Sequence, residues 1–377
     1  MSSGSQRNPT LSVEVPLGDR SYPIKIGTQQ IDSFSQTILA TLPDLSHALV
    51  IADTAVEDPW AKQLTDSLTA CQTEGGKPVR VSTLSVPSGE TSKSVSQLSE
   101  IWQWMLDCST DRSSVLIAVG GGVIGDLAGF AAASFTRGIR FIQVPTTLLA
   151  MVDSSVGGKT GINLPTSKNM VGAFWQPSLV LIDTDVLSTL PERAYISGLA
   201  EVIKYGVIDD ADFFDWLEAN ATKLVAREDE AVRHAIAESC RSKSRVVGED
   251  ERETSGRRAI LNYGHTFAHA IEATAGYGEL LHGEAVAIGM QMAANMAVDL
   301  GMCDASLLSR QNDLLLACGL PTTFAEADVD AMLPVMQRDK KVSHGKLRFI
   351  LPERIGSVGL VGDIAPDAVI RAIESCR

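Results

Sequence analysis

At 377 residues the chain is long enough for two domains with hydrophobic cores. Its net charge of -14 argues against nucleic acid or an anionic membrane as the main partner, and no apolar run is long enough to predict a membrane span. The first residues lack the apolar core of a signal peptide, which predicts a disordered tail over residues 1–10. The six cysteines show no paired spacing, which predicts reduced thiols and a cytoplasmic protein.

The first half of the chain predicts an α/β domain over residues 11–185. Short apolar runs bounded by turn residues predict strands, and helices are expected between them, at 60–71 and around Trp102. Asp53 follows the third run, where an acid either accepts hydrogen bonds from a ribose or simply forms a turn. The expected strands cover residues 11–15, 23–26, 47–52, 79–86, 115–119, 141–144 and 179–182.

A glycine motif lies between the fifth of these strands and an alanine-rich helix. Gly120, Gly122 and Gly125 satisfy G-x-G-x-x-G, a spacing that lets backbone N–H groups and a helix N-terminus approach a pyrophosphate. The motif comes later than in an ordinary Rossmann unit, and the next strand carries no acid. Residues 145–169 then predict a long, ordered, loop-rich wall of an active site.

The second half predicts a mostly helical domain over residues 186–377. Residues 189–192 read as a helix capping box, and Gly301 and Gly319 are expected to end helices. A hairpin is expected at 347–351 and 358–361, with a last helix at 367–375. The other expected helices cover 190–208, 211–226, 229–248, 265–274, 283–300, 304–317 and 328–337.

Three of the six histidines fall between residues 265 and 282. His265 and His269 are four apart and share one helical face, and His282 begins an apolar helix. An open catalytic zinc site needs a third protein ligand, for which Glu201 is our choice. The spacing alone favours metal binding and a plain hydrogen-bonded pair about equally.

Several motifs together resemble the 3-dehydroquinate synthase family of sugar-phosphate cyclases. They read GGGVIGDLAGF from residue 120, RGIRFIQVPTTLLA from 137, DSSVGGKTGIN from 153, AEVIKYG from 200, GHTF from 264 and LHGEAVAIGM from 281. The resemblance extends over residues 10–375. It implies an NAD-binding α/β domain, a helical metal-binding domain, a homodimer, and Zn²⁺, or Co²⁺ in its place.

The resemblance also implies an activity, the conversion of 3-deoxy-D-arabino-heptulosonate 7-phosphate to 3-dehydroquinate and phosphate in the shikimate pathway. Such a phosphate-eliminating carbon–oxygen lyase oxidises a ring hydroxyl with NAD, eliminates phosphate, returns the hydride and closes the ring by an aldol step. Because the substrate is anionic and the protein is negative overall, cations must be gathered locally.

Matching motif to motif assigns candidate roles. The implied metal ligands are Glu201, His265 and His282. The implied cofactor contacts are Asp53, Glu90, Lys93, Gly121, Gly122, Asp126, Thr146, Thr147, Lys159, Lys168 and Thr189. The implied catalytic residues are Lys159, Lys204, His269, Asn262, Arg258 and Lys243. The implied substrate-binding residues are Asp153, Lys168, Asn169, Arg137, and Lys340 and Lys341, which fit one motif equally well.

Three other interpretations stay open. A related cyclase acting on sedoheptulose 7-phosphate would share the cofactors and the fold. A metal-dependent polyol dehydrogenase would consume NAD stoichiometrically. A non-catalytic metal- or nucleotide-binding protein would leave the basic residues unexplained.

Overall fold

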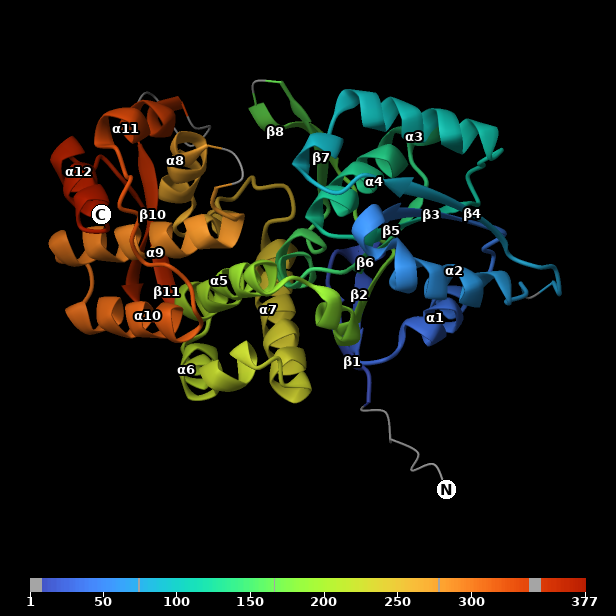
Figure 1. Ribbon diagram of the computed structural model, residues 1–377, viewed down its shortest axis with the longest axis horizontal. Coiled ribbons are helices and arrows are strands. Elements are labelled where there is room, and N and C mark those ends of the chain that lie inside the picture. The colour runs from blue at the N-terminus through green and yellow to red at the C-terminus, as the bar shows by residue number, and fades with distance from the viewer. Residues whose placement is uncertain (1–8, 74, 166, 277–278, 339–346) are drawn as a thin grey trace. The chain divides into compact units, whose positions relative to one another are not determined.

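The chain forms two compact units. The computed structural model describes residues 9–73, 75–165, 167–276, 279–338 and 347–377, so most of the predicted N-terminal tail lies outside the described residues. The first unit holds the residues up to Leu190 together with Lys243–Gly248, and the second holds Pro191–Ser242 and Glu249–Arg377 (Figure 1). The predicted division at residues 185 and 186 remains a prediction.

The first unit is built on a seven-stranded sheet with the order β1-β2-β9-β6-β5-β3-β4. β1 pairs with β2 in antiparallel register, and the other neighbours are parallel. All seven predicted strands are confirmed, within one residue at either end. The strands are β1 (Leu11–Val15), β2 (Tyr22–Gly27), β3 (His47–Asp53), β4 (Arg80–Val86), β5 (Val115–Gly120), β6 (Arg140–Pro145) and β9 (Leu179–Asp183).

Burial along the strands explains this order. Every residue of β5 and of β9 is buried, as expected for parallel strands covered on both faces, whereas the edge strand β4 is mostly accessible. α4 packs on β5 and β6, and Leu116, Leu127 and Phe141 meet in the core between them. The helices of this unit are α1 (Phe34–Thr41), α2 (Lys62–Thr69), α3 (Val95–Asp107) and α4 (Gly122–Ser134).

The stretch 145–169 was predicted to be loop-rich, and that prediction is wrong. A π-helical turn (Ala150–Ser154) is followed by an antiparallel hairpin of β7 (Lys159–Leu164) and β8 (Ser167–Phe174). A glycine in this stretch allows close strand pairing instead, because a Cβ on Gly161 would lie 2.6 Å from the carbonyl oxygen of Val171. β8 is largely exposed, so it lacks the apolar alternation that announces a strand.

The second unit is mostly helical. α9 is buried along most of its length and packs against α5, α8, α10, α12 and β10. The predicted helices and hairpin are confirmed, with boundary shifts of up to three residues. They are α5 (Glu192–Asp209), α6 (Ala211–Val225), α7 (Asp229–Glu249), α8 (His265–Ala275), α9 (His282–Asp299), α10 (Ala305–Ala317), α11 (Val329–Arg338), β10 (Arg348–Arg354), β11 (Ser357–Gly362) and α12 (Pro366–Glu374).

Turn residues around these helices were predicted with mixed success. Gly301 and Gly319 have φ values of 68° and 77° and end α9 and α10 as expected. The capping box at 189–192 is wrong, since no side chain caps α5. The Thr189 hydroxyl instead donates to Val186 O and accepts a hydrogen bond from the Trp60 indole, at 3.0 and 2.8 Å.

One helix, α7, contributes to both units. Its residues Lys243–Gly248 group with the first unit, and the remainder groups with the second. Ser244 donates a hydrogen bond of 2.6 Å to the carbonyl oxygen of Glu14, and a Cβ on Gly248 would lie 3.0 Å from Pro16. These contacts attach this turn of α7 to β1 and to Pro16, the residue that follows it.

The α/β N-terminal part and the mostly helical C-terminal part confirm the predicted fold class. Among the helices that the structure describes, none combines the length and the apolar character that crossing a bilayer requires.

Asp183, at the end of β9, is 1% exposed and accepts hydrogen bonds from the amides of Gln29, Gln30 and Ile31 at 2.8, 2.6 and 2.8 Å. We expect Asp183→Ala to lower the free energy of unfolding by roughly 3 kcal/mol, because three backbone amides lose their buried acceptor. Thermal unfolding followed by circular dichroism measures this. Asp66→Ala, which removes an exposed acid paired with Lys62, is the control and should change little. Equal effects of the two substitutions would contradict the prediction.

Candidate metal centre and nucleotide-binding loop

Three potential metal ligands converge in the second unit. Glu201 comes from the middle of α5, and His265 and His282 are the first residues of α8 and α9. Nε2 of His265 lies 3.7 Å, and Nε2 of His282 lies 3.9 Å, from Oε1 of Glu201. One donor atom from each residue lies within 4.8 Å of the others. The structure therefore brings together the three residues that spacing and resemblance singled out.

The electrostatics of this cluster fit a divalent metal ion. Glu201 is fully buried, its Oε2 contacts the ammonium group of Lys204, and within the described residues its Oε1, which lies toward the two imidazoles, has no hydrogen-bond partner. Two imidazoles and a carboxylate form a common zinc donor set, whose atoms would lie about 3.4 Å apart around a tetrahedral ion. The distances of 3.7 and 3.9 Å from Oε1 of Glu201 to the two imidazole nitrogens exceed this by a few tenths of an ångström.

Lys204 contacts the same carboxylate. It follows Glu201 by three residues on α5, forms an ion pair with it, and is 1% exposed. Its ammonium group also donates a hydrogen bond of 2.7 Å to the carbonyl oxygen of Leu261. The lysine thus balances part of the buried negative charge, which would otherwise be costly to keep away from water.

Backbone contacts set the start of α9 against α5. The amide of Gly283 donates to the Ser197 hydroxyl at 3.0 Å, and a Cβ at this glycine would lie only 1.8 Å from the Ser197 carbonyl oxygen. Arg193 on α5 also forms a bidentate ion pair with Glu284 on α9, with distances of 2.7 and 2.8 Å. His282 is therefore positioned by its neighbours in the chain as much as by its own side chain.

The start of α8 is set against α9 in the same way. Gly264 has a φ of 78°, which favours glycine, and a Cβ there would lie 2.7 Å from the amide nitrogen of Met290. Tyr263 is fully buried, and its hydroxyl donates to the side chain of Gln311 at 2.7 Å. The carbonyl oxygen of Tyr263 lies 3.1 Å from Nδ1 of His265, so the other ring nitrogen faces Glu201.

His269 lies beside this cluster. Its ring centroid is 5.7 Å from that of His265 in an edge-on arrangement, and its side chain is exposed. The set of three converging donors does not include it.

Asp250 organises the turn that carries Arg258 and Asn262. It accepts hydrogen bonds from the amides of Thr254, Ser255 and Arg258 at 2.8, 3.1 and 3.2 Å. Burial raises the pKa of the Asp250 carboxyl, and these amides more than offset that effect, so the pKa falls to about 2. Arg258 is 2% exposed and donates to the carbonyl oxygen of Glu251 at 2.7 Å.

The first unit places the glycine motif where the expected nucleotide contacts meet. Gly121 caps α4, and a Cβ on Gly120 would lie 3.2 Å from Cβ of Asp53, at the end of a neighbouring strand. The Thr146 amide donates to the carbonyl oxygen of Gly120 at 3.0 Å, and Thr147 approaches Gly121 closely. The bare backbone at a helix N-terminus suits a phosphate group.

Lys93 contacts one residue that the resemblance assigns to the cofactor, Asp126, and one that it assigns to the substrate, Asn169. Its ammonium group is 5% exposed and contacts both Asp126 and the side-chain oxygen of Asn169. Glu90 accepts a hydrogen bond of 2.6 Å from Asn163, whose own side-chain oxygen accepts the Asn169 amide at 2.9 Å.

A second buried lysine, Lys243 on α7, forms an ion pair with Asp153 and donates to its carbonyl oxygen at 2.7 Å. Both residues were implied to lie near substrate, and the structure brings them together within the first unit.

The remaining candidates are more dispersed. Lys159 and Lys168 are exposed on the hairpin of β7 and β8, and Arg137 is exposed with a φ of 70°. Lys340 and Lys341 lie outside the described residues. Sequence reasoning missed Ser197, Asp250 and Tyr263, because serine, aspartate and tyrosine at those positions carry no spacing signal of their own.

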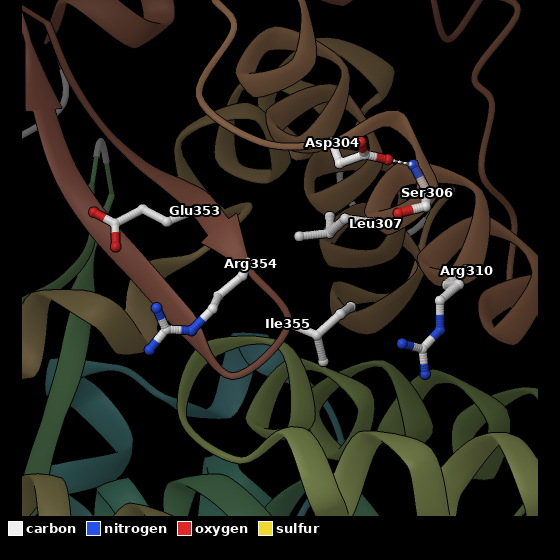
Figure 2. Close-up of a pocket in the computed structure, with 7 residues that line it drawn as sticks. All are labelled: Asp304, Ser306, Leu307, Arg310, Glu353, Arg354 and Ile355. Atoms are coloured by element: carbon white, nitrogen blue, oxygen red, sulfur yellow. Dashed lines mark hydrogen bonds between the residues drawn. The ribbon is translucent and has the colours of Figure 1, made fainter.

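A hollow of about 290 Å³ lies elsewhere in the second unit (Figure 2). It lies between α10 and the turn that joins β10 to β11, with Asp304 accepting a hydrogen bond of 2.8 Å from the Ser306 amide. None of the described candidate site residues lines this hollow. Its lining residues are Asp304, Ser306, Leu307, Arg310, Glu353, Arg354 and Ile355.

Solved structures with a similar fold define the class. A 2-deoxy-scyllo-inosose synthase complexed with carbaglucose-6-phosphate, NAD⁺ and Co²⁺ superposes with a TM-score of 0.87 at 27% identity, over 97% of this chain and 100% of that one. The 2-epi-5-epi-valiolone synthase of Streptomyces hygroscopicus subsp. jinggangensis, with NAD⁺ and Zn²⁺ bound, gives 0.84 and 28%, over 94% and 96% of the two chains. The chain thus has the fold of the sugar-phosphate cyclases.

Sequence comparison narrows the class. The family descriptions "3-dehydroquinate synthase N-terminal" and "3-dehydroquinate synthase C-terminal" match residues 83–197 and 198–342. A 3-dehydroquinate synthase of Rhodopirellula baltica is 62% identical over 374 residues, which is 98% of either chain. The chain therefore belongs to the 3-dehydroquinate synthase family, and the predicted family and enzyme class are confirmed.

We expect Gly283→Ala to lower the thermal midpoint by several degrees, because the added methyl group would overlap the Ser197 carbonyl oxygen and push α9 away from α5. Scanning calorimetry measures the change. Gly362→Ala is the matched control, since a Cβ there would meet its nearest neighbour, Arg348, at an ordinary 3.9 Å. A variant at 283 as stable as the control would show that the helix contact tolerates a side chain.

Proposed function

We propose that the chain catalyses the reaction for which its family is named, the conversion of 3-deoxy-D-arabino-heptulosonate 7-phosphate to 3-dehydroquinate and phosphate. The observation that carries the proposal is the 62% identity with a 3-dehydroquinate synthase along 98% of both chains. The chain is then a phosphate-eliminating lyase of the shikimate pathway, and the sedoheptulose 7-phosphate alternative is not favoured.

In this proposal Glu201, His265 and His282 hold a divalent metal ion, Zn²⁺ or Co²⁺. The fully buried carboxylate facing two imidazole nitrogens supports the assignment. A metal ion bound there would lower the pKa of a coordinated substrate hydroxyl and polarise the ketone formed from it. Lys204, in contact with Glu201, would steady the charge of the site, and the exposed His269 would hydrogen-bond the substrate.

The first unit would bind NAD. The glycine motif at the start of α4 would take the pyrophosphate, Asp53 a ribose, and Glu90, Lys93, Asp126, Thr146, Thr147 and Thr189 the rest of the cofactor. NAD would supply a reversible hydride acceptor, regenerated in each cycle. The relatives solved with NAD⁺ support this assignment, as does the close approach of Asp53 to the glycine loop.

Lysine and arginine side chains of the candidate site would bind the phosphate and the carboxylate of the substrate. Lys243 and Arg258 are buried cations whose N–H groups could donate hydrogen bonds to an anionic group. The side chain of Asn169 contacts Lys93. The proposed substrate-side set is Asp153, Lys159, Lys168, Asn169, Lys204, Lys243, Arg258, Asn262, His269 and either Lys340 or Lys341.

We further propose a cytoplasmic homodimer in which Arg137 reaches the phosphate of substrate bound by the other subunit. The six free cysteines support a reducing compartment. Arg137 is exposed in the turn that follows α4, where a Cβ on Gly138 would lie only 2.3 Å from the indole ring of Trp175.

Purified protein should release phosphate from 3-deoxy-D-arabino-heptulosonate 7-phosphate, need only trace NAD, accumulate no NADH, and stop when a chelator is added. A phosphate assay with a parallel absorbance record measures all of this. Sedoheptulose 7-phosphate is the control substrate and should release little phosphate. Preference for the control substrate, or steady accumulation of NADH, would refute the proposed activity.

His265→Ala should lose both bound metal and turnover, because one of the three proposed metal ligands is removed. Metal analysis and the phosphate assay check the two effects separately. His234→Ala serves as the control, since His234 packs on Trp216 with ring centroids 4.2 Å apart, away from the metal ligands. Retained zinc with a normal rate in His265→Ala would overturn the ligand set.

A further inference from the structure

We propose that Glu272 is a positioning residue for the metal ligand His282, holding Nδ1 of its ring so that Nε2 faces Glu201. Oε1 of Glu272 lies 3.5 Å from Nδ1 of His282, and Nε2 of the same ring lies 3.9 Å from Oε1 of Glu201. The imidazole is thus flanked by carboxylates on both sides. This inference rests on the metal centre of the proposed function.

One face of α8 carries the residues concerned. His265, His269 and Glu272 stand at positions i, i+4 and i+7 of the helix and so point the same way. The rings of His265 and His282 have centroids 5.4 Å apart and an interplanar angle of 68°. Glu272 therefore reaches across from the helix that supplies one ligand to the ring that supplies another.

The chemistry of imidazole explains why such a group is needed. A neutral ring has one N–H donor and one lone pair, so a hydrogen-bond acceptor at Nδ1 leaves the lone pair on Nε2 for the metal. His265 has an acceptor of this kind in the carbonyl oxygen of Tyr263, at 3.1 Å. At His282 the carboxylate of Glu272 takes that place, and its charge also makes the ring a stronger ligand.

The position of Glu272 on α8 gives it no lysine or arginine as a neighbour along the helix. The residues three and four away are Ala268, His269, Ala275 and Gly276. Glu272 stands in the last turn of α8, where the helix dipole disfavours a negative charge. Its side chain is only 17% exposed, so solvation does not account for it either.

The test measures metal affinity directly, with Zn²⁺ or Co²⁺ alone as the probe and a chromophoric chelator as competitor. Metal-free Glu272→Ala should bind the ion about 10–100-fold more weakly than the unmodified protein. Glu272→Gln should lie between the two, because its amide oxygen still accepts the Nδ1 proton but carries no charge. The visible absorption of bound Co²⁺ should change in Glu272→Ala, since the ring is free to turn.

The matched control is Glu279→Gln, which removes one exposed carboxylate from the connection between the same two helices and should keep full affinity. Circular dichroism of the metal-free proteins confirms that each variant is folded, and Glu272→Gln decides the matter if Glu272→Ala does not fold. Unchanged affinity in the folded Glu272 variants overturns the positioning role while leaving the metal centre intact. An unmodified protein that binds neither ion overturns the metal centre itself.

Discussion

The carboxylate of Glu201 is buried away from water, so its negative charge must be compensated by neighbouring groups. Helices α5, α8 and α9 place those groups around it. An ion of this kind costs several kcal/mol to bury when nothing opposes it. Lys204 opposes it from one side, and the imidazoles of His265 and His282 approach from another. Oε2 of Glu201 contacts Lys204, whereas within the described residues no hydrogen bond reaches Oε1, which leaves that oxygen available to a cation.

The same constraint governs the other buried cations of the candidate site. Lys93, Lys204 and Lys243 are each at most 5% exposed, and each contacts one acid, namely Asp126, Glu201 or Asp153. A protein with a net charge of -14 can keep ammonium groups inside only by pairing them. An anionic substrate would therefore meet cations whose positions are already fixed by neighbouring carboxylates.

Much of this organisation could be predicted from the sequence, and each feature that could not be predicted has a physical reason. Apolar periodicity located the long helices, including those that begin at His265 and His282, and the glycine motif located the turn before α4. The hairpin of β7 and β8 was not predicted, because an exposed strand that contains glycine shows no alternation of apolar and polar residues. Likewise, nothing local marks Lys243–Gly248 as part of the α/β unit, since that grouping depends on contacts with residues far away in the chain. Assignment of the substrate-side residues relied on family motifs rather than on spacing.

Glycines at the two ligand-bearing helix starts let main chain meet main chain, at Gly264 against α9 and at Gly283 against α5. Close packing between these backbone segments therefore sets the positions of the potential ligands. No ion is needed to draw the helices together. In small zinc-dependent folds, by contrast, binding and folding are one event. In the proposed metal centre, loss of the ion and loss of the fold would therefore be separable, so an emptied protein could be reloaded without having to be refolded.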